Sequence, residues 1–250
     1  MIKKILQPFY TLYVLTLFVS SVLIAFPFFA LISIGNNIAA RKAIWKIIHL
    51  WSRGWLWIIG MPIKIQGTPP SKEHHIIVAN HISYLDALVL FPSIPFYFRA
   101  LGKKEFAKIP VIGFIYRQLV VLVDRSSQHS RAKSMKLMWR VLKHESSIAI
   151  FPEGTFNETP DLLKNFYDGA FRLAINTGVP IVPLIFPDTV LRWHYSHWWK
   201  LSPGLNRAIY LPPIPAAGLT LQDLPALKEK VYQAMEQELQ KYGYPYQPTN

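Results

Sequence analysis

The hydrophobic pattern of the chain changes at about residue 60. Before this point apolar residues form long stretches, whereas after it short β-branched runs alternate with segments whose apolar residues have helical spacing. We therefore expect an α/β domain over residues 61–241, with a mixed β-sheet of about six or seven strands surrounded by helices. The short runs predict strands at residues 61–67, 76–79, 96–100, 119–123, 147–151, 179–186 and 209–215. The amphipathic segments predict a helix that begins at Ser83 and further helices over residues 126–144, 169–178 and 224–240.

An uncharged stretch at residues 5–40 precedes this domain. It is longer than the roughly 20 residues that span a bilayer, and Pro8 and Pro27 interrupt it. A cleaved signal peptide is the main alternative, but its apolar region would be only about 7–15 residues long and would end in small residues. The length of this stretch and its many Phe, Leu and Ile residues favour a retained anchor.

Positive charges flank the uncharged stretch on both sides, at Lys3, Lys4, Arg41, Lys42 and Lys46. A single span is normally biased to one side, so this symmetry favours a re-entrant or monotopic helical hairpin on the cytoplasmic leaflet. Its second helix, at about residues 43–57, mixes basic residues with Trp, as membrane interfaces do, and a Trp-rich core helix is the alternative. We expect a membrane-anchoring helical segment at residues 1–60, an active domain on the cytoplasmic face, and a flexible tail at residues 242–250.

Composition narrows the class of protein further. Hydrophobic residues make up 51% of the chain and charged residues 16%, below the usual share of about a quarter. The net charge of +13 predicts an anionic partner. The sequence contains no helix-turn-helix, zinc or RNA-binding signature, so we expect an anionic membrane surface and no nucleic acid. The absence of cysteine excludes disulfides, thiolate catalysis and Cys-type metal sites.

A histidine and an aspartate follow the strand predicted at residues 76–79. His81 comes directly after Asn80, and Asp86 lies five positions beyond His81. Residues five apart on a regular helix are separated by about 140°, so the two side chains meet only if His81 lies before the helix and folds back over its first turn. A carboxylate that holds one imidazole nitrogen leaves the other to take a proton from a hydroxyl. The alternative is that His81 packs or caps, and that Asp86 merely favours the helix dipole.

A second turn, Pro152-Glu153-Gly154-Thr155, follows the strand predicted at residues 147–151. Such a turn exposes backbone amides and a carboxylate at the carboxyl end of a strand, where open α/β sheets place ligands. The His81-to-Asp86 spacing and this Phe-Pro-Glu-Gly run, in this order, resemble the glycerolipid acyltransferase family, whose best-known members acylate lysophosphatidic acid. The resemblance covers about residues 61–187.

The resemblance implies transfer of a fatty acyl group from acyl-CoA or acyl-carrier protein to a lysophospholipid hydroxyl. His81 would be the general base and Asp86 would orient its imidazole. The acceptor favoured by the resemblance is lysophosphatidic acid, and no cofactor or metal is implied beyond the thioester co-substrate. Lysines on a basic turn suit phosphate binding, and a solvated basic face is the alternative. The implied acceptor-binding residues are Lys103, Lys104, Arg125, Glu153, Gly154 and Thr155.

Two positions depart from the family pattern. Members with lysophosphatidic acid activity carry Arg directly after the Phe-Pro-Glu-Gly-Thr run, where this chain has Phe156, and Asp168 replaces a basic residue. The loss of a bidentate guanidinium leaves a lyso-lipid with an aminolipid or phosphodiester head group as an alternative acceptor. Arg125 or Lys164 are the candidate replacements.

Other functions make different demands on the sequence. A membrane-anchored lipid hydrolase would carry a Gly-x-Ser-x-Gly nucleophile elbow, which the chain lacks. A non-catalytic lipid-binding relative would keep the fold without needing His81. The aromatic and basic segment at residues 192–200 has two histidines but no nearby carboxylate or Cys, so we expect a membrane-facing loop there and no metal site.

Overall fold

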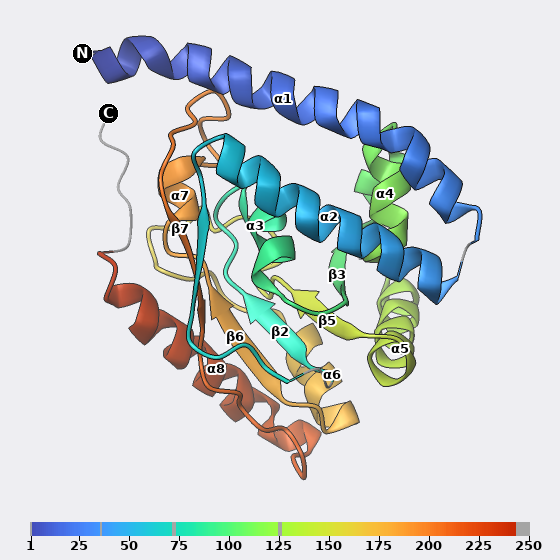
Figure 1. Ribbon diagram of the computed structural model, residues 1–250. Helices are drawn as coiled ribbons and strands as arrows, with labels where there is room; N and C mark the ends of the chain where they lie inside the picture. Colours follow the sequence, from blue (N-terminus) through green and yellow to red (C-terminus); the bar gives the residue numbers. More distant parts are fainter. Residues whose placement is uncertain (1, 36, 72–73, 125–126, 244–250) are drawn as a thin grey trace.

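The computed structural model describes residues 2–35, 37–71, 74–124 and 127–243, and a seven-stranded sheet forms its centre (Figure 1). The strand order is β1-β7-β6-β2-β5-β3-β4, and every neighbouring pair is parallel except β6 and β7. This mixed sheet confirms the predicted α/β class. The strands are β1 (Ile63–Gln66), β2 (Ile76–Ala79), β3 (Phe98–Lys103), β4 (Val120–Val123), β5 (Ser147–Ile150), β6 (Ile181–Ile185) and β7 (Asn206–Tyr210).

Helices cover both faces of the sheet. Side chains alternate along a strand, and all four residues of β2 are buried because each face of the strand meets a helical layer. Ile76 and Val78 pack with α5 (Gln128–His144), α6 (Gly169–Thr177) and α8 (Leu224–Gln240), whereas Ile77 and Ala79 pack with α2 (Ile38–Ile58) and α3 (Asp86–Ser93). The remaining helical elements are α1 (Ile2–Ser33), η1 (Lys104–Lys108), α4 (Ile112–Leu119), α7 (Thr189–Arg192) and η2 (Leu221–Asp223).

The predicted pair of N-terminal helices is present, with α1 lying along the outer side of α2 (Figure 1). α1 runs unbroken through Pro8 and Pro27, so the interruption predicted at these prolines is wrong. A proline removes one hydrogen bond and bends a helix, and a long helix can keep its remaining bonds around it. Leu6–Ser33 is long and apolar enough to cross a membrane, and only 6% of its most apolar window is buried.

The tryptophans of α2 mostly pack inward. Trp55 is buried, and the rings of Trp51 and Trp55 lie 5.7 and 5.6 Å from the ring of Phe18 in α1. Trp45 packs against the sheet, whereas Trp57 is 73% exposed. Three of these four tryptophans therefore favour the core-helix alternative, because the outer helix α1 shields them from solvent.

Five parallel strands present their carboxyl ends at one edge of the sheet, namely β2, β3, β4, β5 and β6. At that edge the Asn80 side chain joins the ends of β2 and β6. Its Oδ1 accepts the Phe186 backbone N–H at 2.8 Å, and its Nδ2 donates to the Phe186 carbonyl at 3.3 Å. This bridge fixes the point from which His81 leaves the sheet. The tail predicted at residues 242–250 falls mainly on residues 244–250, outside the described part of the chain.

Candidate active site

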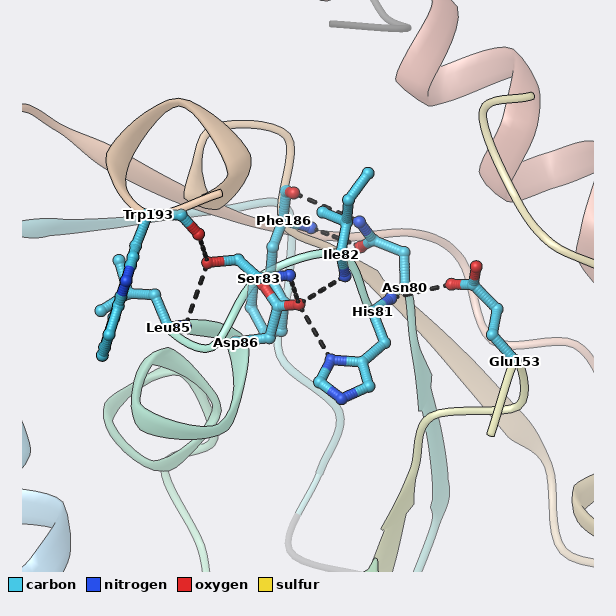
Figure 2. A network of polar contacts seen from close by, with 9 residues as sticks. All are labelled: Asn80, His81, Ile82, Ser83, Leu85, Asp86, Glu153, Phe186 and Trp193. Atoms are coloured by element: carbon cyan, nitrogen blue, oxygen red, sulfur yellow. Dashed lines mark hydrogen bonds and ion pairs between the residues drawn. The ribbon is translucent and has the colours of Figure 1, made fainter. Parts of the chain in front are cut away.

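His81 and Asp86 meet in the turn between β2 and α3, with His81 folded back over the first turn of the helix (Figure 2). The His81 Nδ1 lies 3.0 Å from Oδ2 of Asp86, a carboxylate that is fully buried. The same oxygen accepts the backbone N–H groups of Ile82 at 2.7 Å and Ser83 at 2.8 Å. These bonds hold the carboxylate against the imidazole before any substrate binds.

The helix predicted to start at Ser83 begins three residues later, at Asp86. The Ser83 hydroxyl accepts the Leu85 N–H at 3.0 Å and donates to the Trp193 carbonyl at 2.5 Å (Figure 2). The Asp86 carboxylate caps the Ser83 N–H, as a capping box does, but the intervening residues form a turn rather than a helix. This turn brings the His81 ring and the Asp86 carboxylate to the same place.

The contacts of the His81 ring fix its tautomer and its plane. Because a carboxylate only accepts, Nδ1 is the donor and Nε2 keeps a lone pair that can take a proton. The Phe151 ring is stacked on the imidazole, with centroids 4.1 Å apart and planes at 15°. Phe156 covers it from another direction at 4.5 Å. The His81 side chain remains 19% exposed, so a substrate hydroxyl can reach it.

A buried carboxylate also holds the backbone of His81. Glu153 Oε1 accepts the His81 N–H at 2.8 Å, and its Oε2 accepts the Lys164 N–H at 2.9 Å. Glu153 is only 1% exposed. Burial raises the pKa of Glu153 to about 8, although the two N–H donors act in the opposite direction. The His81 carbonyl in turn accepts the Asn157 N–H at 2.8 Å, so the loop after β5 fixes the histidine on both sides.

The other residues of the Glu153 turn lie beside this carboxylate. Gly154 has a φ of +73°, a left-handed conformation that favours glycine at this turn. The Thr155 hydroxyl accepts a hydrogen bond from Lys164 Nζ at 2.8 Å. The structure therefore brings Glu153, Gly154 and Thr155 next to His81, together with Lys164, a candidate replacement for the missing guanidinium. It adds Asn157, which the sequence did not assign to this turn.

The predicted basic residues lie farther along the same edge of the sheet. Lys103 is the last residue of β3, and β3 lies two strands from β2, about 10 Å across the sheet. Lys104 forms an ion pair with Asp124 at the end of β4. Arg125 lies outside the described residues. In the described part of the chain, no group of three or more His, Asp or Glu residues is arranged to hold a metal.

Aromatic rings from a distant segment complete the surroundings of His81. We define the aromatic wall as Tyr84, Phe156, Trp193 and Tyr195. Tyr84 lies 4.9 Å edge-on from Phe156 and 5.2 Å from Trp193, and Tyr195 is stacked on Phe156 at 6.0 Å. The loop predicted at residues 192–200 thus sends two of its side chains toward the site, whereas Trp198 is 58% exposed. Sequence reasoning missed this contribution, because no local motif relates this loop to His81.

Comparisons with known proteins agree on one family. The family model described as Acyltransferase matches residues 62–187. The 1-acyl-sn-glycerol-3-phosphate acyltransferase of Limnanthes douglasii is 32% identical over 197 residues, which cover 78% of this chain and 69% of that protein. The human 1-acyl-sn-glycerol-3-phosphate acyltransferase alpha is 29% identical, over 76% of this chain and 68% of its own.

A solved structure matches the whole fold. The crystal structure of the 1-acyl-sn-glycerophosphate (LPA) acyltransferase, PlsC, from Thermotoga maritima superposes with a TM-score of 0.79, covering 98% of this chain and 99% of that one. The sequence identity is 21%, so this likeness establishes the shared fold.

Proposed function

This chain belongs to the acyltransferase family, and from that premise we propose that it transfers a fatty acyl group from acyl-CoA or acyl-carrier protein to a lysophospholipid hydroxyl. Lysophosphatidic acid is the acceptor we propose, with phosphatidic acid as the product. The observation that carries the proposal is the buried Asp86 carboxylate 3.0 Å from His81 Nδ1, at the edge of the sheet. No cofactor takes part in this reaction.

The proposed chemistry needs one base and no covalent enzyme intermediate. Nε2 of His81 takes the proton of the acceptor hydroxyl while the hydroxyl oxygen attacks the thioester carbonyl. A C–O bond forms and the carbonyl electron pair moves to the oxygen. When the carbonyl forms again, the C–S bond breaks and the departing thiolate takes the proton from His81. Asp86 stabilises the imidazolium that exists between these steps.

We assign Glu153 to positioning rather than to acceptor binding. Both of its oxygens accept backbone N–H groups, and the side chain is buried, so an acceptor has no free carboxylate to contact. Lys103, Lys104, Gly154, Thr155 and Arg125 remain the proposed acceptor-side residues. Lys104 would exchange its partner Asp124 for the phosphate.

One observation favours a second acceptor. Phe156 places an apolar ring 4.5 Å from the His81 imidazole, at the position where related enzymes carry a guanidinium. A ring cannot neutralise a phosphomonoester, so a lyso-lipid with an aminolipid or phosphodiester head group is the alternative. A non-catalytic lipid-binding relative is the third reading, and it predicts no chemistry at His81.

We propose that residues 1–60 anchor the enzyme on an anionic membrane surface, with the active domain on the cytoplasmic face. The inner side of α1 is bound to the domain at both ends. Thr11 Oγ1 donates to the Trp199 carbonyl at 2.8 Å, and Phe26 packs edge-on against Phe114 at 5.8 Å. A helix attached in this way lies along the membrane surface with its apolar outer side in the lipid, which favours a monotopic arrangement.

An acceptor panel tests the proposed substrate. Detergent-purified protein is incubated with acyl-CoA, or with acyl-carrier protein, and with lysophosphatidic acid or lyso-lipids bearing other head groups. We expect the highest kcat/KM with lysophosphatidic acid. Transfer only to an aminolipid or phosphodiester acceptor would show that lysophosphatidic acid is not the substrate. No transfer with either donor would contradict the enzyme proposal.

A further inference from the structure

The outer surface of α5 carries a stripe of positive charge, formed by Lys133, Lys136, Arg140 and Lys143. At 3.6 residues per turn these four positions lie within about 80° of the helix circumference. All four are exposed, and none forms an ion pair with a described residue. α5 contains no Asp or Glu, so its outer surface is cationic along its whole length.

The stripe has apolar neighbours, which distinguishes it from a simply solvated face. Leu137 and Trp139 lie on its two flanks and are 38% and 37% exposed. Lys143 Nζ lies 5.0 Å from the centroid of the Trp139 ring. Exposed apolar side chains surrounded by unpaired cations are typical of a surface that binds an acidic protein.

α5 lies on the opposite face of the sheet from the N-terminal helix pair. Met138, Val141 and Leu142 of α5 pack in the core on the same face of the sheet as α6 and α8. α2 covers the opposite face, and α1 lies outside α2 (Figure 1). When the apolar outer side of α1 meets a membrane, the stripe therefore points to the aqueous side. This placement favours a soluble anionic partner over a lipid surface.

The first turn of α5 is close to the edge of the sheet at which His81 lies. α5 follows β4, whose carboxyl end lies at the same edge as His81. Three strand intervals separate β4 from β2, about 14 Å. β3 ends between them at Lys103, and Lys104 follows as the first residue of η1. A flexible donor arm that carries a phosphate and ends in a thioester would cross these lysines on its way from α5 to His81.

We propose that the α5 stripe is the docking surface for an acidic acyl-carrier protein, which delivers its thioester to His81 across the ends of β4, β3 and β5. This inference rests on the proposed acyl transfer and names the donor that the protein surface recognises. Free acyl-CoA lacks a protein body, so it would use the same route past the lysines without needing the stripe.

The test compares two donors with the same acyl chain. The double variant Lys136→Glu/Arg140→Glu is assayed beside a control of equal charge change, Lys64→Glu/Lys230→Glu, whose exposed positions lie on β1 and α8. We expect kcat/KM for acyl-carrier protein to fall about tenfold or more in the α5 variant, through KM, because charge complementarity raises association rates by about 10- to 10³-fold. We expect kcat/KM for acyl-CoA to stay within about twofold, and the control to match wild type.

Each other outcome overturns the docking surface. Equal effects of the two variants would show a response to net charge alone. If the α5 variant loses activity with both donors in liposomes but not in detergent, the stripe binds the membrane instead of a carrier protein. Transfer from acyl-CoA but not from carrier protein by wild type would refute the docking surface and leave the enzyme proposal standing, whereas no transfer with either donor would remove the enzyme proposal as well.

Discussion

Replacement of Glu153 by Gln separates a positioning role from a substrate-binding role. Gln offers one acceptor oxygen and one NH2 donor, so either the His81 N–H or the Lys164 N–H would face a second donor. An unsatisfied buried N–H costs about 1–3 kcal/mol. If this cost is expressed as displacement of the histidine, kcat falls by about 10- to 100-fold.

The assay is steady-state acyl transfer with both substrates varied. We expect the acceptor KM of Glu153→Gln to change by less than about threefold while kcat falls, because the carboxylate does not reach the acceptor. The matched control is Glu158→Gln, which makes the same change at an exposed position of the same loop and should behave as wild type. An acceptor KM that rises tenfold with unchanged kcat would refute the positioning role.

The same variant changes how stability depends on pH. Burial raises the pKa of Glu153 to about 8 from its ordinary value of 4.5, so the folded protein retains a proton that the unfolded chain releases between these values. The free energy of unfolding therefore falls as pH rises through this window, by at most about 5 kcal/mol at about 1.36 kcal/mol for each pKa unit. Glu153→Gln should flatten this slope in denaturant titrations at several pH values, and an unchanged slope would contradict the assignment.

Three further predictions follow from the site and the anchor. Asp86→Asn should lower kcat by about 10³- to 10⁴-fold in steady-state assays, because the amide no longer holds the imidazole in its reactive tautomer; a loss below tenfold would contradict the pair. Phe156→Arg should lower KM for lysophosphatidic acid by about tenfold, because a guanidinium binds phosphate bidentately, with Phe156→Leu as control; an equal effect of both would contradict this reason. Leu23→Asp/Ile24→Asp should reduce flotation with anionic liposomes, because α1 exposes these side chains, while activity in detergent stays near wild type; unchanged flotation would contradict the anchor.

The fold was largely predictable because each buried strand of the sheet is a short apolar run. β2 and β5 are four-residue strands with every side chain buried, and the sequence predicted both. Element ends were less predictable. β3 continues to Lys103, three residues beyond the predicted end, because Gly102 and Lys103 form backbone hydrogen bonds with β4. Neither residue is apolar, so the hydrophobic pattern did not predict this extension. α1 continues through its prolines because α2 and α4 pack along it.

The site was predictable where it depends on local spacing. The spacing predicted that His81 folds back over the helix start if its side chain meets Asp86, and in the structure the two side chains do meet. The burial of Glu153 was not predictable, because a Pro-Glu-Gly turn can point its carboxylate outward or inward. Lys104 pairs with the residue after β4, and Phe156 stacks on a ring from the loop after α7; these pairings exist only once the chain has folded.

The variant His81→Ala tests whether His81 is the base in acyl transfer. Wild type, His81→Ala and the matched control His144→Ala, which removes an exposed histidine at the end of α5, are assayed with acyl-CoA and lysophosphatidic acid. Thermal unfolding is measured on the same samples. We expect kcat to fall by about 10³-fold or more in His81→Ala alone, with an unfolding temperature close to that of wild type. Transfer by a folded His81→Ala protein at the wild-type rate would contradict the assignment of His81 as the base.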